Sequence, residues 1–183
     1  MRAKINFEEE LLKRGVPAEA AKEYGRDIDQ EHFYIRSPKG SDVWRLEVLL
    51  CIETEPSGIR RVCLEESESL EDMCEAFERW FYGIYGWHEI LNRFNSGYIY
   101  SWIWDKDKKG QFFRNVSLDD VMVVEAGKHW LVLYKSRGLM HSVTEEDECV
   151  DFYGMYNWSF RAHEEAKRIR KEINLCKKEY EGE

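Results

Sequence analysis

The nine residues WRLEVLLCI at positions 44–52 shape the predicted fold more than any other stretch of this 183-residue chain. Alternate positions carry the apolar side chains Trp44, Leu46, Val48, Leu50 and Ile52. A period of two predicts a β-strand that buries one face. Pro56, Ser57 and Gly58 then favour a turn, and residues 59–64 are expected to return as an antiparallel partner. This stretch therefore predicts a hairpin in the core of a sheet.

A long amphipathic helix is predicted after this hairpin, over residues 70–85. Its apolar side chains form one continuous stripe at helical spacing, made of Leu70, Met73, Cys74, Phe77, Trp80, Phe81, Ile84 and Tyr85. Such a stripe is typical of a helix that packs on a sheet. Gly83 and Gly86 loosen its end, and residues 87–94 are expected to add a further turn or two of helix.

The remaining elements place the chain in the α+β class. Helices are expected over residues 7–14 and 17–26, within an N-terminal helical segment of residues 1–30, and a long C-terminal helix over residues 157–180. Further short strands are predicted at residues 32–36, 98–104, 111–115, 121–125, 130–135 and 139–143. We therefore predict one globular domain, residues 1–183, in which an antiparallel sheet of about five to seven strands carries its helices on one face.

Composition narrows the functional classes. The formal net charge of −9 argues against general binding of nucleic acid or anionic membranes by the body of the protein. The longest apolar run, residues 48–52, is far too short to cross a bilayer, and residues 1–20 lack the apolar stretch of a signal peptide. The five cysteines show no C-x-x-C spacing and are expected to stay reduced. The predicted location is the cytoplasm of a bacterial host cell.

No motif for a metal, a cofactor or catalysis is complete, so no catalytic residue, metal or cofactor is predicted. Asp105, Asp107 and Gly110 are spaced like part of a calcium loop, but the other oxygen ligands are missing. His88 begins a pattern like that of a zinc-protease helix, yet Asn92 stands where the second histidine is needed.

An enzyme whose site assembles from distant residues stays open as an alternative. Cys51 or Cys63 together with His129 would supply a nucleophile and a base, although the strand periodicity places Cys51 in the interior. A deep pocket that combines His88 or His129 with carboxylates would also favour an enzyme. A second alternative is a toxin-immunity or housekeeping interaction domain.

Two runs of carboxylates are the candidate binding site. They are Glu65, Glu66, Glu68, Glu71, Asp72 and Glu75, and then Glu145, Glu146, Asp147, Glu148 and Asp151. Ser67 or Ser69 can cap the helix that begins near residue 70, and Thr144 with Asp147 has the spacing of a capping box for another helix. Acids in a first helical turn are stabilising by about 0.3–1 kcal/mol each. Helix starts therefore account for Glu71, Asp72, Glu145, Glu146 and Asp147, and leave in excess Glu65, Glu66, Glu68, Glu148 and Asp151.

The excess acids indicate a surface that imitates nucleic-acid phosphate. Carboxylates three or four residues apart on a helix lie about 5–6 Å from each other, which suits a cationic groove built for a phosphate backbone. Aromatic residues are 14% of the chain and would anchor such an interface. In size, acidity, aromatic content and lack of catalytic motifs the chain resembles the anti-CRISPR and anti-restriction proteins of phages and mobile elements. That resemblance implies a protein-binding inhibitor, without catalysis of its own, of a nucleic-acid-guided defence nuclease such as Cas9.

The predicted C-terminal helix carries cations that the acidic runs do not explain. They include Arg161, Lys167, Arg168, Arg170 and Lys171. We expect them to form a solvated helix face, and they are the residues placed to touch RNA or DNA in a complex. The predicted partner is thus a basic, nucleic-acid-binding nuclease, with a secondary contact to nucleic acid through this helix.

Overall fold

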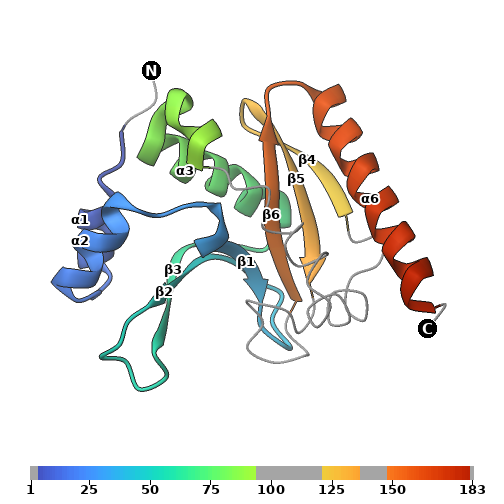
Figure 1. Ribbon diagram of the computed structural model, residues 1–183. Helices are drawn as coiled ribbons and strands as arrows, with labels where there is room; N and C mark the ends of the chain where they lie inside the picture. Colours follow the sequence, from blue (N-terminus) through green and yellow to red (C-terminus); the bar gives the residue numbers. More distant parts are fainter. Residues whose placement is uncertain (1–3, 94–120, 137–147, 182–183) are drawn as a thin grey trace.

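In the part of the chain that the structure describes, residues 4–93, 121–136 and 148–181, one six-stranded antiparallel sheet forms the centre (Figure 1). This computed structural model has the strand order β3-β2-β1-β6-β5-β4. The strands are β1 (Phe33–Ser37), β2 (Trp44–Cys51), β3 (Ile59–Ser67), β4 (Val121–Ala126), β5 (His129–Ser136) and β6 (Glu148–Tyr156). The α+β class is confirmed, and so is the hairpin predicted from residues 44–52, which is β2 paired with β3.

Two groups of three sequential strands make up this sheet. β1, β2 and β3 form one group and β4, β5 and β6 the other, and the groups join where β1 pairs with β6. Across that junction Tyr34 lies opposite Asp151, and Ile35 lies opposite Val150. Because these partners are far apart in the sequence, no local pattern specifies the junction.

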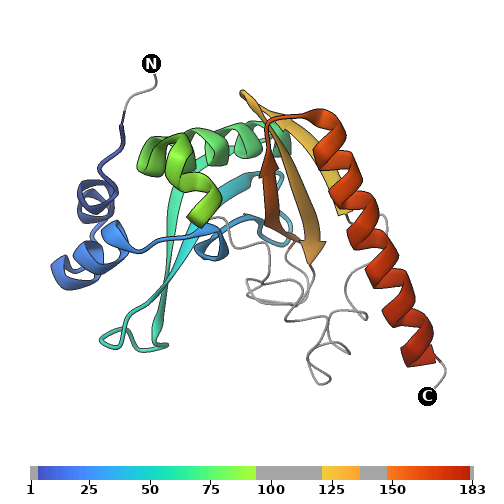
Figure 2. The ribbon, with the colours of Figure 1, turned by 45° about the horizontal axis from the view of Figure 1, so that its top comes forward.

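Three of the described helices share a core with one face of the sheet. They are α1 (Phe7–Lys13), α2 (Ala18–Arg26) and α3 (Leu70–Arg93). α3 lies across the strands (Figure 2), and its Phe77 packs on Phe33 of β1 and Phe152 of β6, with ring centroids 5.4 and 3.6 Å apart. Phe7 of α1 extends this aromatic cluster, 6.1 Å from Phe33. The apolar stripe predicted for residues 70–85 is therefore the face of α3 that packs on the sheet.

Two glycines shape these helices. Gly86 has φ +67° and ψ 170° inside α3, a conformation that a side chain with a Cβ rarely adopts, and the helix bends there before continuing to Arg93. The predicted break and the additional helical turns are thus confirmed. Gly25 of α2 approaches α1 so closely that a Cβ atom would lie 3.1 Å from the backbone nitrogen of Glu8. Both predicted N-terminal helices are present.

The C-terminal helix α6 (Ser159–Glu181) covers the opposite face of β4, β5 and β6 (Figure 1). Its buried side chains are Ala162, Ala166, Ile169 and Ile173. In β5, Val132 and Tyr134 pack toward α6, whereas Leu131 and Leu133 pack toward α3. Such a strand is apolar at successive positions and has two faces to bury. The prediction that the helices share one face therefore holds for α1, α2 and α3 but not for α6.

β6 corrects the helix expected after Thr144. Residues 148–156 form a strand between β1 and β5, and all of its residues from 149 to 155 are buried. Valine, cysteine and aromatic side chains suit a central strand that is covered on both faces. The acidic residues before it favoured a helix start locally, and pairing with two neighbouring strands overrides that preference.

Several predicted elements lie outside the described residues. They are the strands at residues 98–104, 111–115 and 139–143 and the loop with Asp105, Asp107 and Gly110. Among the helices that are described, none combines the length and the apolar character needed to cross a bilayer.

Candidate functional site

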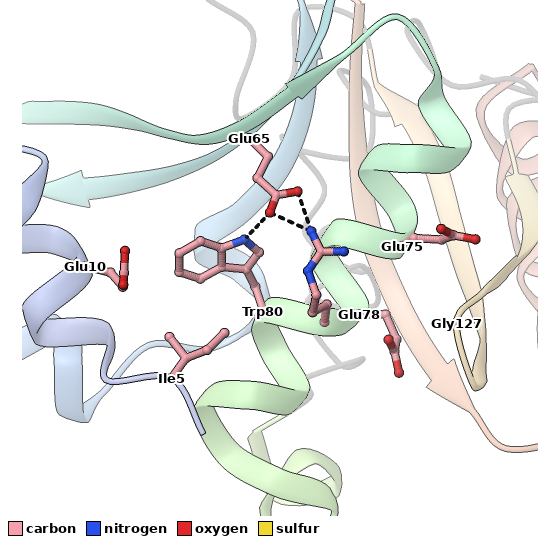
Figure 3. Close-up of a pocket in the computed structure, with 8 residues that line it drawn as sticks. Ile5, Glu10, Glu65, Glu75, Glu78, Trp80 and Gly127 are labelled. Carbon is pink, nitrogen blue, oxygen red and sulfur yellow. Dashed lines mark hydrogen bonds and ion pairs between the residues drawn. The ribbon is translucent and has the colours of Figure 1, made fainter. Parts of the chain in front are cut away.

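A β-bulge directs Glu65 toward α3. The register of β2 and β3 shifts next to Leu46, which pairs with Glu65. One extra residue in β3 reverses the alternation of its side chains, so Glu65 shares the face of the buried Leu46. Arg79 donates to both oxygens of Glu65 at 2.6 Å, and the indole nitrogen of Trp80 donates at 3.2 Å (Figure 3).

This contact leaves Glu75 without a cation. Arg79 stands four residues after Glu75 on α3, the spacing at which a glutamate and an arginine pair best on a helix. The guanidinium of Arg79 is bound to Glu65 instead. Among the described residues no cation pairs with Glu75, which is exposed. Glu65 is therefore a structural acid, and Glu75 carries an uncompensated charge.

A pocket of about 520 Å³ opens beside the Glu65–Arg79 contact (Figure 3). It is lined by Ile5, Glu10, Glu65, Glu75, Glu78, Arg79, Trp80 and Gly127. Arg14 binds Glu10 at 2.8 Å, and this hydrogen bond holds the pKa of Glu10 below its ordinary value. With Glu10 and Glu65 each bound to an arginine, Glu75 and Glu78 are the acids on the side nearest Gly127.

A buried Glu78–His129 pair adjoins the pocket. Oε1 of Glu78 lies 2.7 Å from Nδ1 of His129, and the two side chains are 1% and 6% exposed. The ring of Tyr82 lies 5.7 Å from the imidazole. A carboxylate at Nδ1 fixes the orientation of a histidine ring, in catalytic and in structural pairs alike. The sequence singled out His129 as a histidine that carboxylates could join, but nothing in it identified Glu78, which is 51 positions away.

The start of α3 presents an exposed group of carboxylates. Ser69 caps the helix, since its hydroxyl accepts the backbone N–H of Asp72 at 3.2 Å, as the sequence predicted. The exposed acids here are Glu68, Glu71, Asp72 and Glu75. No described cation forms an ion pair with any of them. On the helix, Glu75 repels Glu71 and Asp72 by about 0.2–0.5 kcal/mol per pair, which offsets part of the stabilisation that Glu71 and Asp72 give to the helix start.

The two acidic runs reach the same end of the sheet. Ser67 at the end of β3 pairs with Trp44, and Ser37 at the end of β1 pairs with Glu148. Three interstrand steps separate β3 from β6, which amounts to about 14 Å. Glu66 also lies at this end, 3.6 Å from Arg45, and more than half of its side chain is exposed. The rest of the second run, Glu145, Glu146 and Asp147, lies outside the described residues.

Asp151, which the sequence predicted as a partner-binding acid, is buried and does not lie on this exposed surface. It is 4% exposed in the middle of β6. It lies in a polar row on the sheet face away from α3, where Tyr134, Asp151, Tyr34 and Glu47 are successive cross-strand partners. Glu47 is 2% exposed and accepts hydrogen bonds from Tyr34 at 2.7 Å and from Arg36 at 2.8 Å.

Arg61 completes the polar row from β3. It donates to the hydroxyl of Tyr34 at 2.8 Å, and its guanidinium lies 5.3 Å from the centre of that ring. Burial, with the neighbouring carboxylate of Glu47, raises the pKa of Tyr34 well above its ordinary value of 10. Sequence reasoning missed this row because alternating charged residues in a strand usually mark a solvent-exposed face.

The cysteine–histidine pair considered as an enzyme alternative does not form. His129 contacts α3, whereas Cys63 pairs with Glu47 and so lies on the other side of the sheet. Burial and the nearby Glu66 raise the pKa of Cys63 to about 11, which keeps its thiol protonated. Cys51 is exposed rather than interior, because it is the last residue of β2.

The cations of α6 divide into free and bound side chains. Arg161, Lys167 and Lys171 are exposed. Arg168 is bound to Glu165, and Arg170 donates to the carbonyl oxygen of Val121 at 2.6 Å. Arg170 therefore fastens α6 to β4, and Arg161, Lys167 and Lys171 face solvent.

Neither a metal site nor a relative points to a function. In residues 4–93, 121–136 and 148–181, no group of three or more histidine, cysteine, aspartate and glutamate side chains is placed to hold a metal ion. Comparison with family models, curated proteins and solved structures finds no match for this chain.

Proposed function

We propose that this chain is a non-catalytic binding protein that inhibits a basic, nucleic-acid-processing nuclease, such as an RNA-guided defence nuclease. Its acidic surface, defined as Glu66, Glu68, Glu71, Asp72, Glu75 and Glu148, would occupy the cationic groove that normally holds nucleic acid. The single observation that carries this proposal is the group of exposed carboxylates at the start of α3, none of which forms an ion pair with a described cation. Their mutual repulsion is a cost to folding, and a basic partner would relieve it.

The pocket next to the acidic surface supports the same proposal. Glu75 belongs to both, and the pocket brings Glu78 and the apolar body of Trp80 beside it. A lysine or arginine side chain from the partner fits this combination, because its stem needs apolar contact and its charge needs carboxylates. Association between such surfaces is fast and weakens as salt is added.

Charge reversal tests this proposal. The triple variant Glu68→Lys, Glu71→Lys, Glu75→Lys is assayed for binding and inhibition against a set of purified basic nucleases that includes an RNA-guided one. We expect the wild type to bind, with an affinity that decreases as the salt concentration is raised from about 50 to about 200 mM. The variant should bind at least about tenfold more weakly.

The matched control reverses three exposed acids elsewhere, Glu19, Glu23 and Glu53, with the same change of net charge. It should bind like the wild type. If the triple variant at α3 binds and inhibits as well as this control, the acidic surface is not the interface. If the wild type inhibits none of the nucleases in the set, the proposed class of partner is wrong.

A small enzyme is the second candidate function, and the Glu78–His129 pair favours it. Glu78 lines a pocket with further carboxylates and lies 2.7 Å from His129 behind it, and a histidine with carboxylates is a combination that general acid–base chemistry uses. Turnover in a screen of hydrolase and transferase substrates would establish it, if it is lost in His129→Gln and kept in the control variant with Glu19, Glu23 and Glu53 reversed. Absence of turnover in the wild type across that screen counts against it.

A further inference from the structure

The solvent-facing side of α6 carries a stripe of one aromatic residue and three lysines. Phe160, Lys167, Lys171 and Lys178 are exposed and follow one another at steps of seven, four and seven residues. At about 100° per residue these steps keep all four within a narrow stripe. The stripe is opposite the buried face of the helix, which contains Ala162, Ala166, Ile169 and Ile173.

Two large aromatic side chains at the start of α6 are mostly exposed. Trp158 is 64% exposed and Phe160 is 59% exposed. The carbonyl oxygen of Trp158 accepts the N–H of Ala162 at 3.2 Å, so Trp158 is held at the first turn of the helix. Two large aromatic side chains this open to solvent, two residues apart in the chain, indicate a contact with another molecule at the start of α6.

The charge around the stripe is locally positive in an otherwise acidic protein. Arg161 is exposed next to Phe160, and it adds to the three lysines. Glu165 is bound to Arg168, so Glu164 is the exposed acid beside the stripe in the described part of α6. The acidic surface belongs to α3 and the ends of β3 and β6, and α6 lies on the other face of the sheet from α3.

We infer that this stripe binds single-stranded nucleic acid. Unstacked bases lie on Trp158 and Phe160, and the phosphates that follow contact Lys167, Lys171 and Lys178. From Phe160 to Lys178 the stripe measures about 27 Å, enough for a short run of nucleotides. A single strand is favoured over a duplex because only unpaired bases offer their faces to aromatic side chains. The proposal does not depend on the proposed function, since the two surfaces share no residue.

Fluorescence anisotropy of labelled oligonucleotides tests the proposal. The probes are single-stranded oligo(dT) and oligo(U) of about 15 nucleotides and a duplex of the same length. We expect the wild type to bind the single strands more tightly than the duplex at low salt. The variant Trp158→Ala, Phe160→Ala should bind at least about tenfold more weakly. In Lys167→Glu, Lys171→Glu the slope of log affinity against log salt should shrink by about 1.4, at about 0.7 per phosphate contact.

Two control variants match these changes elsewhere on the surface. Lys22→Glu, Arg26→Glu alters the net charge equally on α2, and Leu12→Ala removes a similarly exposed apolar side chain from α1. Both should bind like the wild type. All of these positions are exposed, so circular dichroism should show unchanged folds.

Three results would overturn the inference. One is no binding of either single strand at low salt. Another is binding that the α6 variants and the control variants weaken equally. The third is that the wild type binds anionic phospholipid vesicles but no oligonucleotide, and that the α6 variants lose the vesicle binding. That result would assign the stripe to a membrane surface.

Discussion

Replacing Glu47 by alanine tests the buried polar row most directly. The carboxylate is 2% exposed and accepts hydrogen bonds from Tyr34 at 2.7 Å and from Arg36 at 2.8 Å. Removing one member of a buried ion pair costs about 3–5 kcal/mol, because the remaining charge stays desolvated. The side chain of Arg36 is 13% exposed, and Tyr34 and Arg36 both have further contacts. We therefore expect a loss of stability at the low end of this range, about 3 kcal/mol.

Two related variants separate the charge from the hydrogen bonds. Glu47→Gln keeps an oxygen that Tyr34 can donate to, and it should cost about 1–2 kcal/mol. The double variant Glu47→Leu, Arg36→Met removes both partners of the ion pair. It should cost about 1–2 kcal/mol, less than Glu47→Ala, because no charge of the pair is left behind and only the hydroxyl of Tyr34 loses this acceptor.

Urea unfolding followed by tryptophan fluorescence measures these free energies, provided that the slope against urea concentration is the same in all variants. In a chain of this size a loss of about 3 kcal/mol corresponds to a fall of about 6–12 °C in the midpoint of thermal unfolding. A loss below about 1 kcal/mol for Glu47→Ala would refute the reasoning. So would a double variant that is less stable than the single one.

Local contacts elsewhere yield predictions with equally clear signs. Glu65→Ala should lower the free energy of unfolding by about 1–2 kcal/mol, because the indole N–H of Trp80 loses its acceptor, and Glu65→Gln should cost less; equal losses in urea unfolding would contradict this. Gly25→Ala should destabilise the protein although alanine favours helices by about 1 kcal/mol, because its Cβ would lie 3.1 Å from backbone of α1; a higher midpoint would show the close approach to be unimportant. Cys51 and Cys63 are both exposed, but iodoacetamide at about pH 8 should modify Cys51 first, because the pKa of Cys63 of about 11 leaves roughly one of its thiols in a thousand ionised. Peptide mass spectrometry measures the two rates, and faster reaction at Cys63 would contradict the raised pKa.

Features that depend on neighbours in the sequence were predictable. The alternation over residues 44–52 specifies a strand with its partner β3, because a period of two puts the apolar side chains on one face. The stripe of α3 and the cap at Ser69 follow from helical periodicity and from the unsatisfied N–H groups of a helix start. The acidic character of the α3 start is also local, since it needs only the order of residues there.

Features that depend on pairing between distant segments were not predictable. Residues 148–156 become a central strand only because β1 and β5 offer hydrogen-bonding edges on both sides, and this buries Asp151. The partners Glu78 and His129 meet only when α3 crosses the turn between β4 and β5.

The sequence by itself determined the class of the fold, the hairpin of β2 and β3, the core helix α3 and the acidic composition of the candidate surface. Periodicity and capping are local, so one sequence contains all the information that they need. The tertiary structure alone decided which acids are available to a partner. The bulge turns Glu65 toward Arg79, strand pairing buries Asp151, and Glu75 is left exposed. The physical reason is that a charge is compensated only by the groups that the fold places beside it.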